Sequence, residues 1–253
     1  MPTIASLSFH EPLFWLLCLA SFFVGSSKGG LPGIGMLAVP ILSLVMSPVT
    51  AAVLLLPIYI VSDVFGVWLY RREYSAQNLK LLIPAGIAGV LLGWATAAYV
   101  SDQLVSFLIG TLGVAFVLSV WLRPEGDQMA RAVDSGRGLF WGTLSGFTSF
   151  VSHAGAPPYQ VFVLPQRLPK LVFAGTTTIL FACINVAKIV PYWTLQPYTL
   201  NSVWLCLVLL PTAVAGTVLG KLLVQAVSEK WFFRGVQVAL LLISVKLIQN
   251  GFV

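Results

Sequence analysis

Apolar segments, each about as long as a bilayer crossing, alternate with short polar segments along most of the chain. Crossing the hydrocarbon core of a membrane takes about 20 consecutive apolar residues. The stretches that approach or reach this length are residues 48–70, 79–99, 104–122, 171–193, 203–224 and 232–249. The pattern predicts an all-α polytopic membrane protein that keeps its first apolar segment, because residues 1–12 lack the basic residues of a secretory signal.

The composition agrees with this fold class and limits the kinds of molecule that we expect the protein to bind. Of the 253 residues, 58% are hydrophobic and 9% are charged, which is far too apolar for a soluble domain. The net charge of +6 is explained by Lys and Arg retained in cytoplasmic loops, so we expect membrane lipid and no nucleic acid as a partner. Cys18, Cys183 and Cys206 are isolated in apolar sequence and are expected to be small buried residues, with no metal or other cofactor.

Two polar, helix-breaking segments interrupt the apolar pattern. The first, residues 25–33, reads GSSKGGLPG, and the second, residues 150–158, reads FVSHAGAPP. Lys28 and His153 occupy corresponding positions, 125 residues apart. A cationic or titratable side chain inside hydrocarbon is costly unless it faces protein or water. The two breaks are therefore candidate parts of one functional site.

The correspondence extends into the following helices and indicates an internal duplication. We expect a single transmembrane domain over 1–253, with repeat 1 at 12–122, a cytoplasmic linker at 123–137 and repeat 2 at 138–250. Each repeat is predicted to be a broken, re-entrant-like hairpin followed by three transmembrane helices. Matches at an offset of 127 join Pro84 to Pro211, Gly89 to Gly216 and Gly93 to Gly220.

The distribution of basic residues predicts that the two repeats are inverted. Basic residues place the 71–80 and 167–170 loops in the cytoplasm, whereas the uncharged 192–202 connection is expected outside. Loop 71–80 and its repeat partner 192–202 then lie on opposite faces, as in many secondary transporters. Residues 157–166 offer only about 15 Å of helix, about half a bilayer. We therefore expect the hairpins to enter from opposite faces and to bring their tips together near the midplane.

The first tip has the chemistry of an oxyanion site. Lys28 supplies a fixed positive charge, Ser27 a hydroxyl, and Gly29 and Gly30 unobstructed backbone N–H groups. These residues are predicted to bind a small anionic substrate. The alternative is a loop lysine that snorkels to a lipid headgroup.

The second tip is chemically different. Ser152, His153 and Gly155 precede Pro157, which is well placed to restart a helix. His153 is predicted to contact the substrate when protonated or to carry a coupling proton. The alternative is a histidine with a purely structural role.

Four further polar residues in apolar segments are candidates for a pathway or for coupling: Asp63, Thr176, Asn185 and Lys188. Inversion of the repeats argues against direct contact between Asp63 and Lys188, with Asp63 near the cytoplasmic side and Lys188 near the external side. For Asp63, capping a neighbouring helix or facing the interface is an equally open alternative.

Enzyme motifs are absent from the sequence. It contains no His-Glu-x-x-His, no Gly-x-x-x-x-Gly-Lys-[Ser/Thr] and no Cys-x-x-Cys. We therefore expect no enzyme activity, although an intramembrane Ser/His hydrolase is formally open.

The two breaks also carry a family resemblance. The paired signatures are Ser27-Lys28-Gly29-Gly30 with Pro40, and Ser152-His153-Ala154-Gly155-Ala156-Pro157-Pro158 with Pro165, followed by Thr176, Asn185, Lys188 and Tyr192. Together they resemble the sulfite exporter TauE/SafE family, also called TSUP. The likeness covers about residues 12–250, and Ala156 departs from the glycine that family members often carry. The resemblance implies movement of sulfite, sulfonates or sulfoacetate across the bacterial inner (cytoplasmic) membrane, whereas the residues by themselves indicate only an anion.

The leading hypothesis is a secondary transporter of a small sulfur-containing anion that works by alternating access around the two tips. The alternative is an anion channel or a non-transporting membrane scaffold. The sequence leaves the coupling ion, with the proton as a candidate, and the oligomeric state, with a homo-oligomer as a candidate, open.

Overall fold

The polypeptide is helical throughout the part that the structure describes. A computed structural model describes residues 12–29, 34–97, 99, 101–122, 130–226 and 229–251, and these ranges contain no β-strand. The α-helices are α1 (Pro12–Lys28), α2 (Ala38–Leu42), α3 (Pro48–Tyr70), α4 (Ala76–Ala97), α5 (Asp102–Trp121), α6 (Ser135–Ser152), α7 (Ala156–Val163), α8 (Lys170–Ala187), α9 (Ile189–Leu195), α10 (Leu200–Ala226) and α11 (Glu229–Gly251); two short 3₁₀ helices are η2 (Ile34–Leu37) and η3 (Leu164–Gln166). The predicted all-α membrane class is confirmed.

Four segments are long and apolar enough to cross a membrane. They are Pro48–Tyr70, Ala76–Ala97, Leu171–Leu195 and Leu200–Leu219. The third joins α8 and α9, so this crossing is longer than α8 by itself. Large apolar side chains such as Phe65, Trp204 and Leu242 are exposed on these helices and on α11, as expected where a helix faces lipid.

The described helices end at both predicted tips and resume after them; that each tip belongs to a re-entrant hairpin stays a prediction. Helix α1 ends at Lys28 and the chain resumes helical structure at Ile34, whereas α6 ends at Ser152 and α7 begins at Ala156. Pro157 and Pro158 stand in the first turn of α7, where a missing N–H costs nothing. Helix α7 and η3 together end at Gln166, as the half-bilayer length of this segment predicted.

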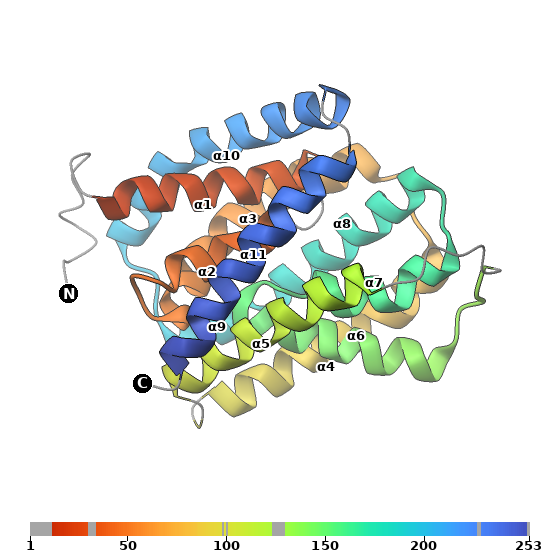
Figure 1. The fold of residues 1–253 in the computed structure, drawn as a ribbon, viewed down its shortest axis with the longest axis horizontal. Coiled ribbons are helices and arrows are strands. Elements are labelled where there is room, and N and C mark those ends of the chain that lie inside the picture. The colour runs from red at the N-terminus through yellow and green to blue at the C-terminus, as the bar shows by residue number, and fades with distance from the viewer. Residues whose placement is uncertain are drawn as a thin grey trace.

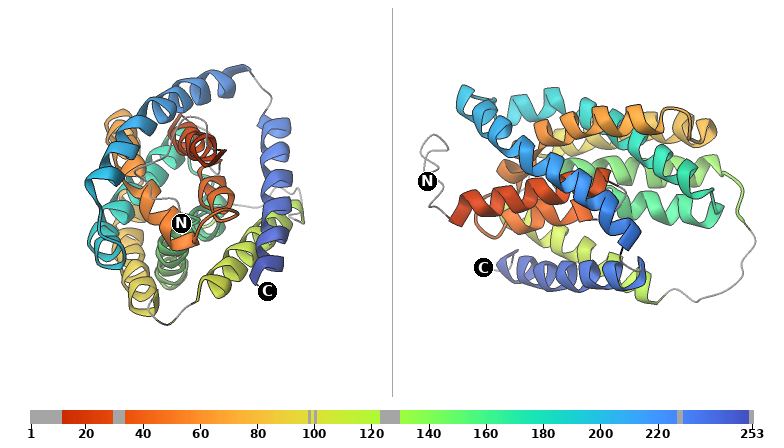
Figure 2. Two further views of the ribbon diagram at one scale, coloured as in Figure 1. Left: turned by 90° about the vertical axis from the view of Figure 1, so that its left-hand side faces the viewer. Right: turned by 90° about the horizontal axis from the view of Figure 1, so that it is seen from above.

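The two hairpins enter the bundle from opposite ends (Figure 1). In that view α1 comes in from the left, beside the N-terminus, and α6 comes in from the right. In the end-on view of Figure 2, α1 and α2 lie inside a ring to which α4, α5, α10 and α11 contribute. The first helices of the hairpins therefore end in the interior of the bundle.

Glycines allow the first helix of each hairpin to lie close against a long helix. Helix α1 packs on α10 and α6 packs on α4. A Cβ added to Gly25 would overlap the carbonyl group of Ala213, and one added to Gly146 would overlap that of Gly86. Gly89 meets the backbone of α6 in the same way. Gly216, which corresponds to Gly89 at the offset of 127, meets the backbone of α1 at Phe22, which is the packing that a repeat produces. The inversion of the repeats stays a prediction.

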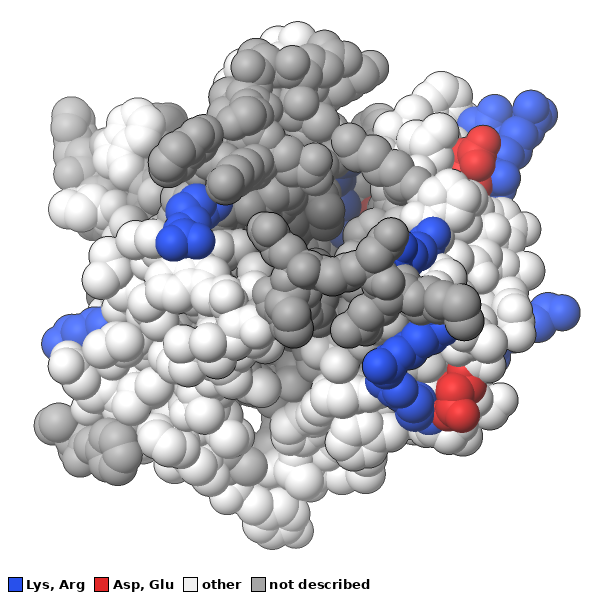
Figure 3. Space-filling view, turned by 45° about the vertical axis from the view of Figure 1, so that its right-hand side comes forward, with Lys and Arg blue, Asp and Glu red and all other residues white. Residues whose placement is uncertain are grey.

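Positively charged loops gather at one end of the molecule, on the right in Figure 1. Arg71 and Arg72 follow α3, Arg131 and Arg137 flank the start of α6, and Arg167 precedes α8. Figure 3 shows Lys and Arg side chains along this side. These are loops that the charge pattern predicted to share a face of the membrane.

Hydrogen bonds hold this end together. Asn78 and Gln166 exchange two side-chain hydrogen bonds, with Nδ2 to Oε1 at 2.8 Å and Nε2 to Oδ1 at 3.1 Å. The hydroxyl of Thr176 accepts a hydrogen bond of 2.8 Å from the backbone N–H of Ser75. Thr176 therefore joins the turn between α3 and α4 to α8, and its place along a pathway stays a prediction.

Candidate functional site

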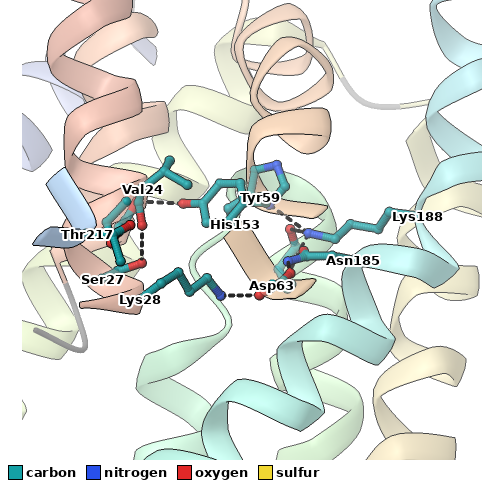
Figure 4. A network of polar contacts seen from close by, with 12 residues as sticks. Val24, Ser27, Lys28, Tyr59, Asp63, His153, Asn185, Lys188 and Thr217 are labelled. Carbon is teal, nitrogen blue, oxygen red and sulfur yellow. Dashed lines mark hydrogen bonds and ion pairs between the residues drawn. The ribbon is translucent and has the colours of Figure 1, made fainter. Parts of the chain in front are cut away.

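Polar side chains from four helices converge where the hairpins end (Figure 4). Lys28 comes from the end of α1, Asp63 from α3, His153 from the end of α6, and Asn185 and Lys188 from the end of α8. We call these five residues the central cluster. Asp63, His153, Asn185 and Lys188 are all less than a tenth exposed. An apolar bundle retains buried charges only where they are paired or functional.

Lys28 forms an ion pair with Asp63. Its Nζ lies 2.5 Å from Asp63 Oδ1, and the two side chains are 10% and 5% exposed. Among the described residues, Asp63 Oδ1 is the acceptor that contacts the Lys28 ammonium group. An ammonium group has three N–H donors, so Lys28 retains donors for a ligand. Its exposed tenth distinguishes it from the fully buried Lys188.

The second oxygen of Asp63 is held by Asn185. Asn185 Nδ2 donates to Asp63 Oδ2 at 2.6 Å. Asp63 and Lys188 were expected near opposite faces, but both belong to the central cluster. The reason is helix length: each lies only about 6–8 Å beyond the midpoint of its crossing, at 1.5 Å per residue. The ion pair in which Asp63 takes part is the one with Lys28.

Lys188 caps the C-terminal end of α6. Its Nζ donates to the carbonyl oxygen of Ser149 at 3.0 Å and to the Ser149 hydroxyl at 3.1 Å, and it lies 2.7 Å from His153 Nδ1. The last carbonyls of a helix lack intrahelical partners and carry partial negative charge. Tyr192 donates to the carbonyl of Phe150 in the same turn. All three ammonium donors of Lys188 therefore have acceptors.

The contacts of His153 assign its protonation state. Nε2 lies 2.9 Å from the carbonyl oxygen of Ala52, which can only accept, so Nε2 carries a hydrogen. Nδ1 faces Lys188, which can only donate, so Nδ1 accepts. The imidazole is therefore neutral here. Its backbone is left-handed, with φ of 54°, which costs a non-glycine residue about 1–2 kcal/mol.

Tyr59 contacts residues of both tips and was not among the site residues predicted from the sequence. Its ring stacks on the His153 imidazole with centroids 4.4 Å apart, and Lys28 Nζ lies 5.7 Å from the centroid of the same ring. The Tyr59 hydroxyl donates to the carbonyl of Gly35 at 2.8 Å. The signal was its position one helical turn before Asp63, on the same face of α3.

The remaining predicted tip residues mainly shape the backbone. The Ser27 hydroxyl donates to the carbonyl of Val24 at 2.6 Å. The Gly29 N–H donates to the carbonyls of Gly25 and Ser26, so it is not free for a ligand in this conformation. Gly30 lies outside the described residues.

On the second tip, the Ser152 hydroxyl donates to the carbonyl of Thr148 at 3.4 Å. The carbonyl of Gly155 accepts a hydrogen bond of 2.7 Å from Ser145. Pro157 is the second residue of α7 and is half-buried. Of the predicted binding residues, Lys28 and His153 are thus the ones that belong to the central cluster.

A separate cavity of about 410 Å³ lies between α3, α9 and α10 and has an apolar lining. The polar groups at its wall are engaged elsewhere. Tyr198 donates to the carbonyl of Val53, whose usual helical donor is removed by Pro57, and Cys206 donates to that of Leu54. The lining contains no charged side chain among the described residues, so we do not assign the anion to this cavity. Among the described residues no group of three His, Cys, Asp or Glu could hold a metal ion.

Residues 17–247 match the sequence profile of the family described as sulfite exporter TauE/SafE. The chain belongs to the TauE/SafE family. The match covers nearly the whole chain and includes every residue of the central cluster. Searches of curated proteins and of solved structures gave no match.

Membership makes this TauE/SafE chain a membrane transporter, because the family consists of transporters of sulfur anions and not of enzymes. The central cluster of the TauE/SafE chain lies at the converging ends of two broken helices, which is where many secondary transporters bind their substrates. Four of its five residues are buried inside the helical bundle.

Proposed function

We propose that this chain is a secondary transporter that moves a small sulfur-containing anion, of the sulfite, sulfonate or sulfoacetate class, across the bacterial cytoplasmic membrane by alternating access. The family assignment supports the class of cargo. The observation that carries the proposal is the charge of the central cluster, which holds two lysines and one carboxylate.

The cluster has a formal surplus of positive charge. Lys28 and Lys188 each contribute one positive charge, Asp63 contributes one negative charge, and His153 is neutral. The carbonyls at the end of α6 offset part of the charge on Lys188, since a helix end carries about half an elementary charge. An uncompensated charge is costly in a weakly polarisable interior. Binding of a small anion to the cluster would therefore be energetically favourable.

Lys28 is the group that we assign to the substrate. It is the cluster lysine with exposed surface, and Lys188 has all its donors occupied. The tip of the first hairpin would present Lys28 to the anion, with the Ser27 hydroxyl nearby on the same turn. Lys188 would hold the second tip in place.

Alternating access fits the arrangement of the two hairpins. Their first helices come from opposite ends of the bundle and meet at Tyr59. In an inverted repeat, a rocking motion of one half against the other opens such a site to each face in turn. His153 is suited to couple the motion to protons, because a proton on Nδ1 would face the Lys188 ammonium and break their contact.

Flux measurements on proteoliposomes test the proposal. The purified protein is reconstituted and supplied with sulfite, sulfoacetate, methanesulfonate or chloride, with and without a pH gradient. We expect saturable flux of at least one sulfur anion, slower flux of chloride, and a response to the gradient. Flux that rises linearly with anion concentration would indicate a channel. No flux of any sulfur anion would contradict the proposed function.

A further inference from the structure

We propose that Asp63 is the resident anion of the binding site, and that the substrate binds by displacing its carboxylate from Lys28. This inference rests on the proposed function, because it assigns a role within the same site. It adds a residue that sets substrate affinity and release, and it predicts that removing a negative charge improves binding but impairs transport.

The ion pair occupies the position that an oxyanion would take. Asp63 Oδ1 lies 2.5 Å from Lys28 Nζ, so the carboxylate is in direct contact with the ammonium group. A sulfite or sulfonate oxygen would present the same charge and geometry to the same ammonium group. A carboxylate so close to Lys28 therefore competes with any anion that needs this lysine.

Among the residues that the structure describes, Asp63 is the buried acidic side chain. Of the acidic side chains that the structure describes, Glu73 and Asp134 are exposed, whereas Asp63 is 4% exposed. The other charged or titratable groups that face the cluster are Tyr59 on α3, His153 at the end of α6, Cys183 and Lys188 at the end of α8, and Tyr192 on α9. The ionised group among these is the Lys188 ammonium, so Asp63 is the negative competitor within the described part of the site.

Asn185 makes the displacement reversible. It binds the other carboxylate oxygen at 2.6 Å, so Asp63 keeps one hydrogen bond when its contact with Lys28 is broken. The carboxylate then stays beside the site and returns to Lys28 when the substrate leaves. A carrier needs binding that is favourable enough to load and weak enough to release, and this exchange of partners provides both.

Sulfite titrations of matched variants test the inference. The wild-type protein, Asp63→Asn and Asp63→Glu are placed in nanodiscs, and sulfite binding is measured by calorimetry at one fixed pH. Asparagine preserves the shape of Asp63 and removes its charge, whereas glutamate keeps the charge. Glu73→Gln removes a negative charge from an exposed position and serves as the control.

We expect D63N to bind sulfite at least about tenfold more tightly than wild type, since Lys28 would lack its competitor. D63E keeps the competing charge and should bind sulfite more weakly than D63N, whereas E73Q should remain within about threefold of wild type. In proteoliposomes D63N should show slower sulfite flux despite its tighter binding, because the carboxylate that assists release is missing.

The outcomes separate this inference from the proposed function. If wild type binds and transports sulfite while D63N binds it no more tightly, the inference is wrong and the transport function stands. If D63N binds tightly but wild type transports no sulfur anion, the transport function fails and the displacement stands. Absence of sulfite binding to both proteins contradicts both.

An infrared measurement requires no variant and covers the case in which D63N does not fold. Difference spectra of wild-type protein labelled with ¹³C-aspartate are recorded with and without saturating sulfite. Displacement predicts a shift of an aspartate carboxylate band on binding. Saturation with sulfite and no shift of any aspartate band would overturn the proposal.

Discussion

His153 Nδ1 accepts a hydrogen bond of 2.7 Å from Lys188 Nζ, and this bond ties the tip of the second hairpin to the crossing formed by α8 and α9. Lys188 is fully buried and its three donors all point at the end of α6. The imidazole is therefore part of the arrangement that permits an ammonium group inside the bundle.

Replacing His153 with alanine should destabilise the protein by about 1–3 kcal/mol, because a buried ammonium donor loses its acceptor. His153→Gln should recover much of this loss, since its side-chain oxygen can accept from Lys188. Tryptophan fluorescence during thermal unfolding in detergent measures the difference. Equal unfolding temperatures for wild type and H153A would argue against the assigned bond.

Transport should depend on pH through His153. Lowering the pH between about 8 and 5 protonates histidine side chains in general. In this site an added proton would face Lys188, so protonation of His153 would break the resting arrangement. The ratio of wild-type flux to H153Q flux should therefore change across the range. A constant ratio would remove His153 from proton coupling.

The contact between α1 and α10 should not tolerate an added methyl group at Gly25. A Cβ at this position overlaps the carbonyl of Ala213, and overpacking of this kind costs about 1–3 kcal/mol. Gly25→Ala should lower the unfolding temperature. Gly136→Ala is the matched control, because its Cβ would meet only Asp134 Oδ1 at 3.6 Å. Similar behaviour of the two variants would mean that the close crossing is absent in the membrane.

The amide pair at the positively charged end should contribute measurably to stability. Asn78→Ala leaves the amide of Gln166 without the two hydrogen bonds to Asn78, and we expect a loss of about 1–3 kcal/mol. Gln77→Ala changes an exposed amide one residue earlier and should have little effect. Thermal unfolding of the two variants provides the comparison, and a loss of stability in Q77A equal to that in N78A would contradict the assignment.

The sequence predicted the architecture well because hydropathy and charge act locally. Several features depend on short stretches of residues. They are the restart of a helix near Pro157, the short length of the helical segment that follows, and the position of the basic loops at one end of the molecule. The meeting of Lys28 and His153 in the interior follows from the same local signals.

The pairing within the site could not be predicted in this way. Asp63 and Lys188 were separated because each was assigned to the end of its helix, whereas α8 and α9 continue one crossing to Leu195. The contacts of Lys28 and Lys188 depend on side-chain directions across different helices, which spacing in the sequence does not specify. Tyr59, an aromatic residue in an apolar helix, carried no signal beyond its position one turn before Asp63.

Sulfite flux into proteoliposomes that contain Lys28→Gln tests whether Lys28 binds the substrate. Lys80→Gln removes the same charge from an exposed position on α4 and is the matched control. We predict that K28Q loses sulfite flux while K80Q transports at the wild-type rate, with both proteins eluting as the wild type does. Wild-type flux through K28Q would contradict the proposed binding site.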